Sequence, residues 1–200
     1  LVTHLSLMNR WKYSGENRDG QIGFKILQDR RDGGQSHFDF DRPPSANPLY
    51  GSRNRIQRYE FFSKAGSALA NGRSLGLILS GFYHHQESFW GKKSYDGEEK
   101  SLHANLIYEK SAQRYTVSSG ISFSLDQRDE IYQQQLFAAD EKVPGVFVEY
   151  TYKPVSQLSV MSGFRYDRHN LYGSFYTPRF HLRYQMDALT SLRLSAGKGY

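Results

Sequence analysis

The segment "TPRFHLRYQ" at residues 177–185 alternates polar and apolar side chains without a break. Its polar members are Arg179, His181, Arg183 and Gln185, and its apolar members are Phe180, Leu182 and Tyr184. Successive side chains of a β-strand point to opposite faces. The segment therefore predicts a strand with one hydrated face and one face that avoids water.

The same period-two alternation recurs along nearly the whole chain, with almost no helical period. In the segment 113–126, for example, Ile121 and Phe123 share one face, while Ser118 and Ser122 share the other. An all-β fold is predicted, with ten strands. These strands are expected near residues 3–13, 21–31, 54–66, 73–86, 99–109, 113–126, 144–153, 157–168, 177–185 and 189–199.

The predicted connections differ in length in a regular way. Those after the odd-numbered strands are short, whereas those near residues 32–53, 87–98 and 127–143 are long. Short turns on one rim and long loops on the other are typical of outer-membrane barrels, whose strands need about 9–11 residues to cross the bilayer. We therefore predict part of an antiparallel, up-and-down transmembrane β-barrel. A soluble β-sandwich that buries the same apolar faces is the alternative.

The composition narrows the class of protein further. The chain is 38% hydrophobic and 23% charged, it contains no Cys, and no apolar run is long enough for a membrane-spanning helix. The absence of Cys removes disulfides and thiolate zinc sites. The net charge of +6 permits anionic partners. Because the basic residues are spread over many predicted strands and do not cluster on a helix, nucleic acid is not an expected partner.

No pattern of catalytic residues stands out. The chain has no G-x-S-x-G motif, and "SAGKGY" at 195–200 lacks the spacing of a phosphate-binding loop. We predict that the protein is not an enzyme and carries no catalytic residues, metal or cofactor.

Several stretches together resemble the β-barrel of TonB-dependent outer-membrane receptors, especially those of the Bacteroidota. The pairing of "TPRFHLRY" (177–184) with the following "RLSAGKGY" (193–200) is the most specific part of this resemblance. The stretches that carry it are "MNRWKY" (8–13), "GGQ" (33–35), "EFFSKAG" (60–66), "FYHHQESFWG" (82–91), "HANLIYE" (103–109), "EKVPGVFVEYTYKP" (141–154), "GFRYDRHNLYGSFYTPRFHLRY" (163–184) and "LRLSAGKGY" (192–200).

The resemblance implies an active transporter in the outer membrane of a Gram-negative bacterium. Such a receptor takes up a scarce nutrient, such as a ferric siderophore or vitamin B12, through a barrel of about 22 strands that is closed by a plug domain and energised by TonB. No plug domain, TonB box or signal peptide is visible in residues 1–200. We therefore expect a curved meander whose first and last strands lack a partner, as part of a larger receptor barrel. A passive porin or an adhesin barrel is the alternative function.

The polar face of the predicted barrel contains the candidate functional residues. They are expected to contact the plug domain and set the charge of the lumen, with attraction of an anionic chelate as the other role. These lumen candidates are Arg165, Arg179, His181, Arg183 and Arg193.

A second group of candidates is expected at the extracellular rim. His84, His85 and Glu87 lie where the fourth predicted strand enters a long loop, and they are candidates for capture of a metal or chelate, with a solvated rim as the alternative. "SHFDFD" at 36–41 is a weaker calcium candidate through His37, Asp39 and Asp41. The proline-containing loop 39–55 could fold over the barrel mouth or stay on the surface.

Overall fold

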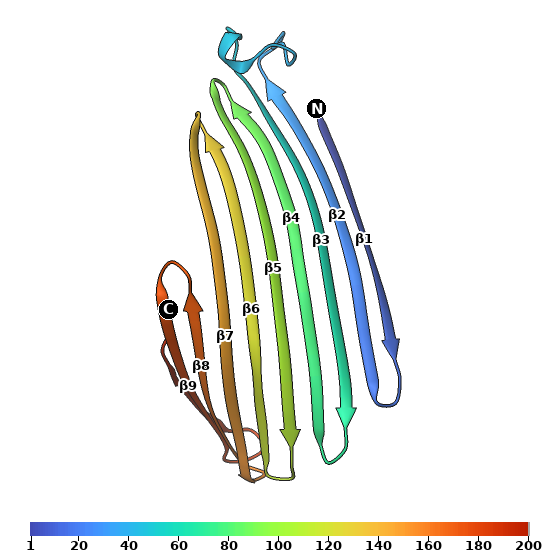
Figure 1. Cartoon of the computed structure of the whole chain (residues 1–200), viewed down its shortest axis with the longest axis vertical. Helices are drawn as coiled ribbons and strands as arrows, with labels where there is room; N and C mark the ends of the chain where they lie inside the picture. The colour runs from blue at the N-terminus through green and yellow to red at the C-terminus, as the bar shows by residue number, and fades with distance from the viewer. Residues whose placement is uncertain (200) are drawn as a thin grey trace.

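The computed structural model describes residues 1–199 as one antiparallel sheet whose ten strands follow one another in chain order (Figure 1). Each strand pairs only with its neighbours in the sequence, so β1 and β10 are edges of the described sheet. The strands are β1 (Val2–Ser14), β2 (Arg18–Gly34), β3 (Gly51–Leu69), β4 (Arg73–Trp90), β5 (Lys93–Ser111), β6 (Tyr115–Tyr132), β7 (Gln135–Val155), β8 (Leu158–His169), β9 (Gly173–Gln185) and β10 (Ser191–Gly197). The predicted all-β meander with open edges is confirmed.

The register between strands aligns the alternating patterns, so each face of the sheet has one character. One face, which we call the apolar face, consists of the odd-numbered residues of β1, β3, β4 and β6 and the even-numbered residues of the other strands. We call the opposite side the polar face. One row of the apolar face runs across six strands through Leu77, Leu106, Ile121, Val146, Tyr166 and Tyr176. The parallel row on the polar face includes Asn105, Ser122, Gly145 and Asp167.

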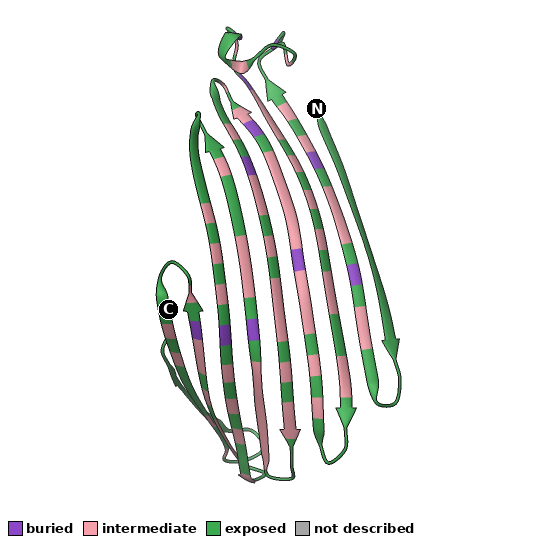
Figure 2. Cartoon of the chain, viewed as in Figure 1, coloured by how far each residue is buried: buried purple, intermediate pink, exposed green. Residues whose placement is uncertain are grey.

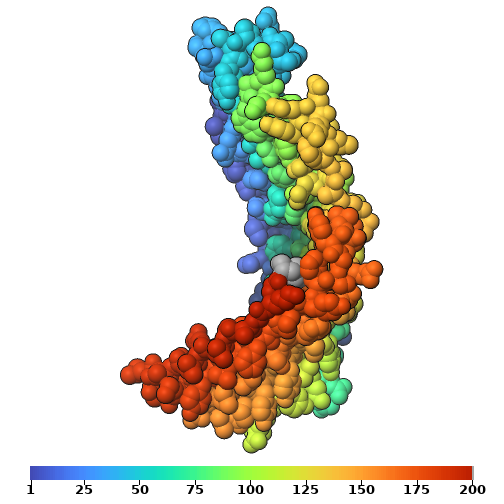
Figure 3. All heavy atoms as spheres, turned by 90° about the vertical axis from the view of Figure 1, so that its left-hand side faces the viewer, coloured from blue at the N-terminus to red at the C-terminus, as the bar shows by residue number. Residues whose placement is uncertain are grey.

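The sheet is curved like a segment of a barrel wall, with β9 and β10 turned out of the plane of the other strands (Figures 1 and 3). Side chains converge on the inside of a curve and spread apart on the outside. Asp167 and Ser122 on the polar face are 0% and 6% exposed, whereas Ile121 and Val146 on the apolar face are 57% and 50% exposed. The polar face is therefore the concave side.

Among the described residues, no second sheet covers the apolar face. Buried positions are scattered singly along the strands (Figure 2), and among the described residues Phe38 is the only buried member of the hydrophobic core. A β-sandwich would bury its apolar face against a second sheet. The described fold is thus a partial barrel wall and not a sandwich. No described helix is long and apolar enough to cross a membrane.

The prediction of long loops near 87–98 and 127–143 was wrong. There β4 and β5 continue to a turn at residues 91–92, and β6 and β7 continue to a turn at residues 133–134. The predicted strands ended where apolar alternation stops, but backbone pairing needs no apolar side chains once the strands have left the lipid. The sorting of loop lengths therefore does not hold, and the uncovered apolar face supports the barrel interpretation instead.

The loop at residues 35–50 remains the one long connection between the described strands. It contains a short 3-10 helix at Pro44–Ala46. Figure 1 places this loop at the end of the sheet where β4 and β5 meet, opposite the turns that join β1 to β2 and β3 to β4.

Gly72, in the tight turn between β3 and β4, is a position where only glycine fits. Its φ is +68°, and an added Cβ would fall well inside contact distance of the backbone oxygen of Ser111. We expect Gly72→Ala to reduce the stability of the folded barrel by about 2–3 kcal/mol, since left-handed strain and a backbone clash add. Thermal unfolding in detergent, followed by the mobility difference between folded and unfolded barrel on a gel, measures this effect.

Gly173 provides the matched control for that substitution. It also has a positive φ, +85°, but an added Cβ would meet nothing within 4 Å. Gly173→Ala is expected to cost only the backbone strain, about 1–2 kcal/mol. Equal losses in the two variants would show that the contact with Ser111 contributes nothing.

Candidate functional site

Arg165 is held in the middle of the concave wall by an ion pair and a hydroxyl. Its guanidinium donates at 2.6 Å to both carboxylate oxygens of Asp167 and at 2.7 Å to Ser122 Oγ. Its Cζ also lies 6.0 Å from the ring centre of Phe147. A side chain at Gly145 would collide with Asp167, so the glycine makes room for this pair. Arg165 is therefore neutralised and fixed within the wall.

Arg179 and His181, on β9, also have partners in the wall. Arg179 Nη2 lies 2.9 Å from Glu149 Oε2 on β7. His181 Nδ1 lies 2.8 Å from Ser195 Oγ on β10. Arg179 thus spans β8 to reach β7, as Arg165 spans β7 to reach Ser122 on β6, whereas His181 links the neighbouring strands β9 and β10.

Arg183 and Arg193 form the part of the wall with uncompensated positive charge. They lie directly opposite each other in the β9–β10 register, and two like charges in this arrangement repel. Arg183 Nη2 donates to Gln185 Oε1 at 3.1 Å, and within residues 1–199 neither guanidinium forms an ion pair with a carboxylate. Both line an open groove of about 390 Å³ together with Ser159 and Ser195. Of the five lumen candidates, this pair is the one suited to hold an anionic group.

The predicted rim cluster of His84, His85 and Glu87 does not exist as one site. All three lie inside β4 and not at the entrance of a loop. Because they alternate along a strand, His84 faces the concave side and His85 and Glu87 face the outer side. His84 Nδ1 is buried without a hydrogen-bond partner among the described residues.

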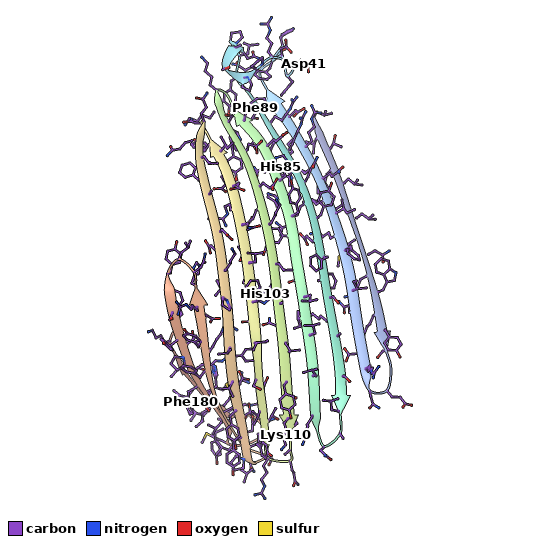
Figure 4. All side chains as sticks on the ribbon, in the orientation of Figure 1. Asp41, His85, Phe89, His103, Lys110 and Phe180 are labelled. Atoms are coloured by element: carbon purple, nitrogen blue, oxygen red, sulfur yellow. The ribbon has the colours of Figure 1, made fainter. Side chains whose placement is uncertain are left out.

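Asp96 on β5 joins His85 and Glu87 in a group that sequence reasoning missed. The ligand atoms of the three side chains all lie within 4.8 Å of one another. Figure 4 labels His85 in the upper part of β4, toward the hairpin turn. Asp96 lies in the segment expected to be a loop, so the alternation pattern gave no signal that would place it beside Glu87.

The calcium candidates of the loop at residues 35–50 do not converge. Asp41 donates its backbone N–H to Asp39 Oδ1 at 3.0 Å, Asp39 pairs with Arg42 at 3.4 Å, and His37 Nδ1 lies near Ser36 Oγ. Within the described chain, the group at His85 is the only set of three metal-ligating side chains. The calcium hypothesis is therefore not supported by the geometry.

Aromatic residues anchor the loop at residues 35–50 to the outer side of the wall. Phe38 is 8% exposed, and its ring centre lies 4.8 Å from that of Phe40 and 6.0 Å from that of Phe89. Arg53 lies over Phe40 at 4.9 Å and bonds Asp32 at 2.8 Å. Phe89 and Arg53 both lie on the apolar face of the sheet. The anchored part of the loop thus packs outside the wall and not over the barrel mouth.

The carboxylate of Asp32 is stabilised in its charged form at this anchor. Partial burial would raise the pKa of Asp32, but hydrogen bonds from Arg30 at 2.6 Å and from Arg53 outweigh it and lower the pKa. Asp32 therefore stays ionised at neutral pH and orients Arg53 over the aromatic rings.

A family of known barrels matches nearly the whole chain. The family model described as "TonB dependent receptor-like, beta-barrel" matches residues 4–200. This chain belongs to the TonB-dependent receptor β-barrel family. The match agrees with the resemblance carried by the segments at 163–184 and 192–200. No curated protein sequence matches the chain significantly.

Two solved structures show the same fold as this receptor barrel. The alcaligin outer-membrane receptor FauA from Bordetella pertussis superposes with a TM-score of 0.76 at 13% identity, over 97% of this chain and 35% of FauA. The siderophore receptor PirA from Pseudomonas aeruginosa does so with a TM-score of 0.56 at 10% identity, over 98% of this chain and 39% of PirA. The chain thus spans little more than a third of these receptors. Neither match bears on the predicted resemblance to Bacteroidota receptors, which stays a prediction.

Proposed function

We propose that this receptor barrel acts in active uptake of a scarce nutrient across the outer membrane of a Gram-negative bacterium. The observation that carries the proposal is a single sheet with an uncovered apolar face and a charged concave face. Such a wall is stable only between lipid on one side and an aqueous or protein-filled lumen on the other. An enzymatic role has no support in this family of receptors.

We propose that the wall is completed by further strands of a larger barrel. The outer edges of β1 and β10 have no partner among residues 1–199, and each unsatisfied backbone group costs several kcal/mol in the bilayer. The family resemblance suggests a total of about 22 strands around a plug domain that transmits energy from TonB. The limited share of FauA that this chain covers supports this proposal.

The proposed cargo is an anionic metal chelate of the ferric siderophore class. PirA is a siderophore receptor by name and FauA an alcaligin receptor by name, which favours this class over vitamin B12. On this wall, Arg183 and Arg193 are suited to attract an anion, or to bond acidic side chains of the plug, because their charge is not neutralised by the sheet. Arg165, Arg179 and His181 would contribute mainly to the rigidity of the wall.

Uptake by cells that express the whole receptor tests the proposal. We expect cells to accumulate radiolabelled iron supplied as a ferric siderophore, and deletion of TonB to abolish this accumulation while the receptor stays in the outer membrane. Several hydroxamate and catecholate siderophores, with labelled vitamin B12 in parallel, would identify the cargo.

Two results would contradict active transport. Uptake that persists without TonB would indicate a passive porin, which liposome-swelling measurements would then confirm. A receptor that takes up none of these compounds but attaches cells to a surface through its extracellular hairpins would indicate an adhesin.

A further inference from the structure

Three metal-ligating side chains meet on the outer face of the β4–β5 hairpin, beyond the lipid-facing residues. On the outer face of β4 the continuous run of apolar side chains ends at Tyr83, and His85 and Glu87 follow it before Phe89 and the turn at residues 91–92. Asp96 stands beside them on β5, with its Oδ1 3.4 Å from His85 Nε2. All three are accessible from outside, since His85 is half-buried and the two acidic residues are exposed.

The strand register, and not a flexible loop, fixes the geometry of this group. His85 and Glu87 are two residues apart on one strand, so they point to the same side. Asp96 is the direct cross-strand partner of Glu87. Pairing continues to Trp90 and Lys93 at the turn, so the backbone holds the three side chains together without reorganisation.

Among the described residues, the two carboxylates of this group have only weak cationic contacts. Two carboxylates directly opposite each other in an antiparallel pair repel. Glu87 has only a long contact with Arg55, at 3.8 Å, and both of these side chains are well exposed, so the contact is weak. Asp96 Oδ1 lies 3.4 Å from His85 Nε2. A divalent cation would turn the repulsion between Glu87 and Asp96 into a shared attraction.

We propose that His85, Glu87 and Asp96 bind a first-row divalent metal ion of the zinc class. One imidazole nitrogen and two carboxylate oxygens suit such an ion, whereas calcium and magnesium ions prefer oxygen ligands alone. Glu87 and Asp96 also line an open groove of about 340 Å³ together with three arginines, of which Arg42 and Arg53 pair with Asp39 and Asp32. The groove leaves room for a water molecule as the fourth ligand. The bound ion joins β4 to β5 outside the lipid, and this inference does not depend on the cargo of the receptor.

Zinc titration of the purified full-length receptor in detergent, without an affinity tag and after removal of metals by a chelator, tests the site. A chromophoric competitor reports the affinity. We expect His85→Gln, Glu87→Gln and Asp96→Asn each to weaken one zinc site by at least about tenfold, a loss that even outer-shell partners of a metal can produce. The matched control is His84→Gln, which removes the adjacent imidazole from the opposite face and is expected to leave this affinity unchanged.

Three outcomes would overturn the proposal. The first is a wild-type affinity weaker than about 100 µM, which corresponds to less than about 5.5 kcal/mol of binding. The second is equal affinity in His85→Gln and His84→Gln, and the third is displacement of zinc by an equal concentration of calcium. The last result would mean that carboxylates alone hold the ion. Gel mobility of the folded barrel confirms that each variant is folded, and the three ligand variants provide independent readings.

Discussion

Leu106→Arg is expected to destabilise the folded receptor by about 2–4 kcal/mol in lipid, because it places a charge on the lipid-facing side of the wall. Leu106 lies in the row of the apolar face between Leu77 and Ile121, and it is 39% exposed with no protein layer above it. In a bilayer this exposed surface contacts acyl chains. Urea titration of the receptor folded into phosphatidylcholine vesicles, followed by tryptophan fluorescence, measures the change.

The matched control places the same charge on the concave face. Ser118 lies on the neighbouring strand β6, and its register partners are Glu109 and Glu149. Arginine at this position points into the lumen beside two carboxylates, so Ser118→Arg is expected to change stability by less than about 1 kcal/mol. Equal destabilisation by the two arginines would contradict the assignment of the faces, and a larger loss in Ser118→Arg would reverse it.

Asp167→Ala is expected to have the second large effect, a loss of about 2–3 kcal/mol in the free energy of unfolding. The carboxylate of Asp167 is completely buried and accepts two hydrogen bonds from Arg165. Removal of the carboxylate leaves the Arg165 guanidinium in the wall without this counter-charge. The free energy lost in this way is larger than the net stability that the intact pair contributes. Because Arg165 is 32% exposed, water offsets part of the cost. The same urea titration measures it.

Glu149→Ala is the matched comparison for this ion pair. Glu149 and Arg179 form a similar pair on the same face, but their side chains are 29% and 46% exposed. Solvent screens such a pair, so its loss is expected to cost about 0–1 kcal/mol. If Asp167→Ala were no more destabilising than Glu149→Ala, burial of the Arg165 pair would not contribute to the stability of the wall.

The arginines of β9 show which features of the polar face the sequence could and could not predict. The alternation at 177–185 assigned Arg179 and Arg183 to the same face, and the register confirms this assignment. The alternation could not show that Arg179 forms an ion pair with Glu149 whereas Arg183 lies opposite Arg193. These encounters depend on which residues of separate strands lie opposite each other.

The rim gives the clearest example of a failed prediction. His84, His85 and Glu87 lie close together in the sequence and are predicted as one cluster, although a strand sends neighbouring residues to opposite faces. Only Glu87 lies in the segment 87–98 that was expected to be a loop, whereas both histidines lie in the predicted strand 73–86, where alternation already places them on opposite faces. The structure continues β4 and β5 through this segment and brings in Asp96, nine positions beyond Glu87.

The sequence by itself determined the ten strands, the character of their two faces and the family, because side-chain alternation is a local property of an extended backbone with a period of two residues. The tertiary structure alone decided where the strands end, which charges are neutralised and which side chains from different strands meet. These features follow from the register of cross-strand hydrogen bonds, and backbone groups pair in the same way whichever side chains they carry.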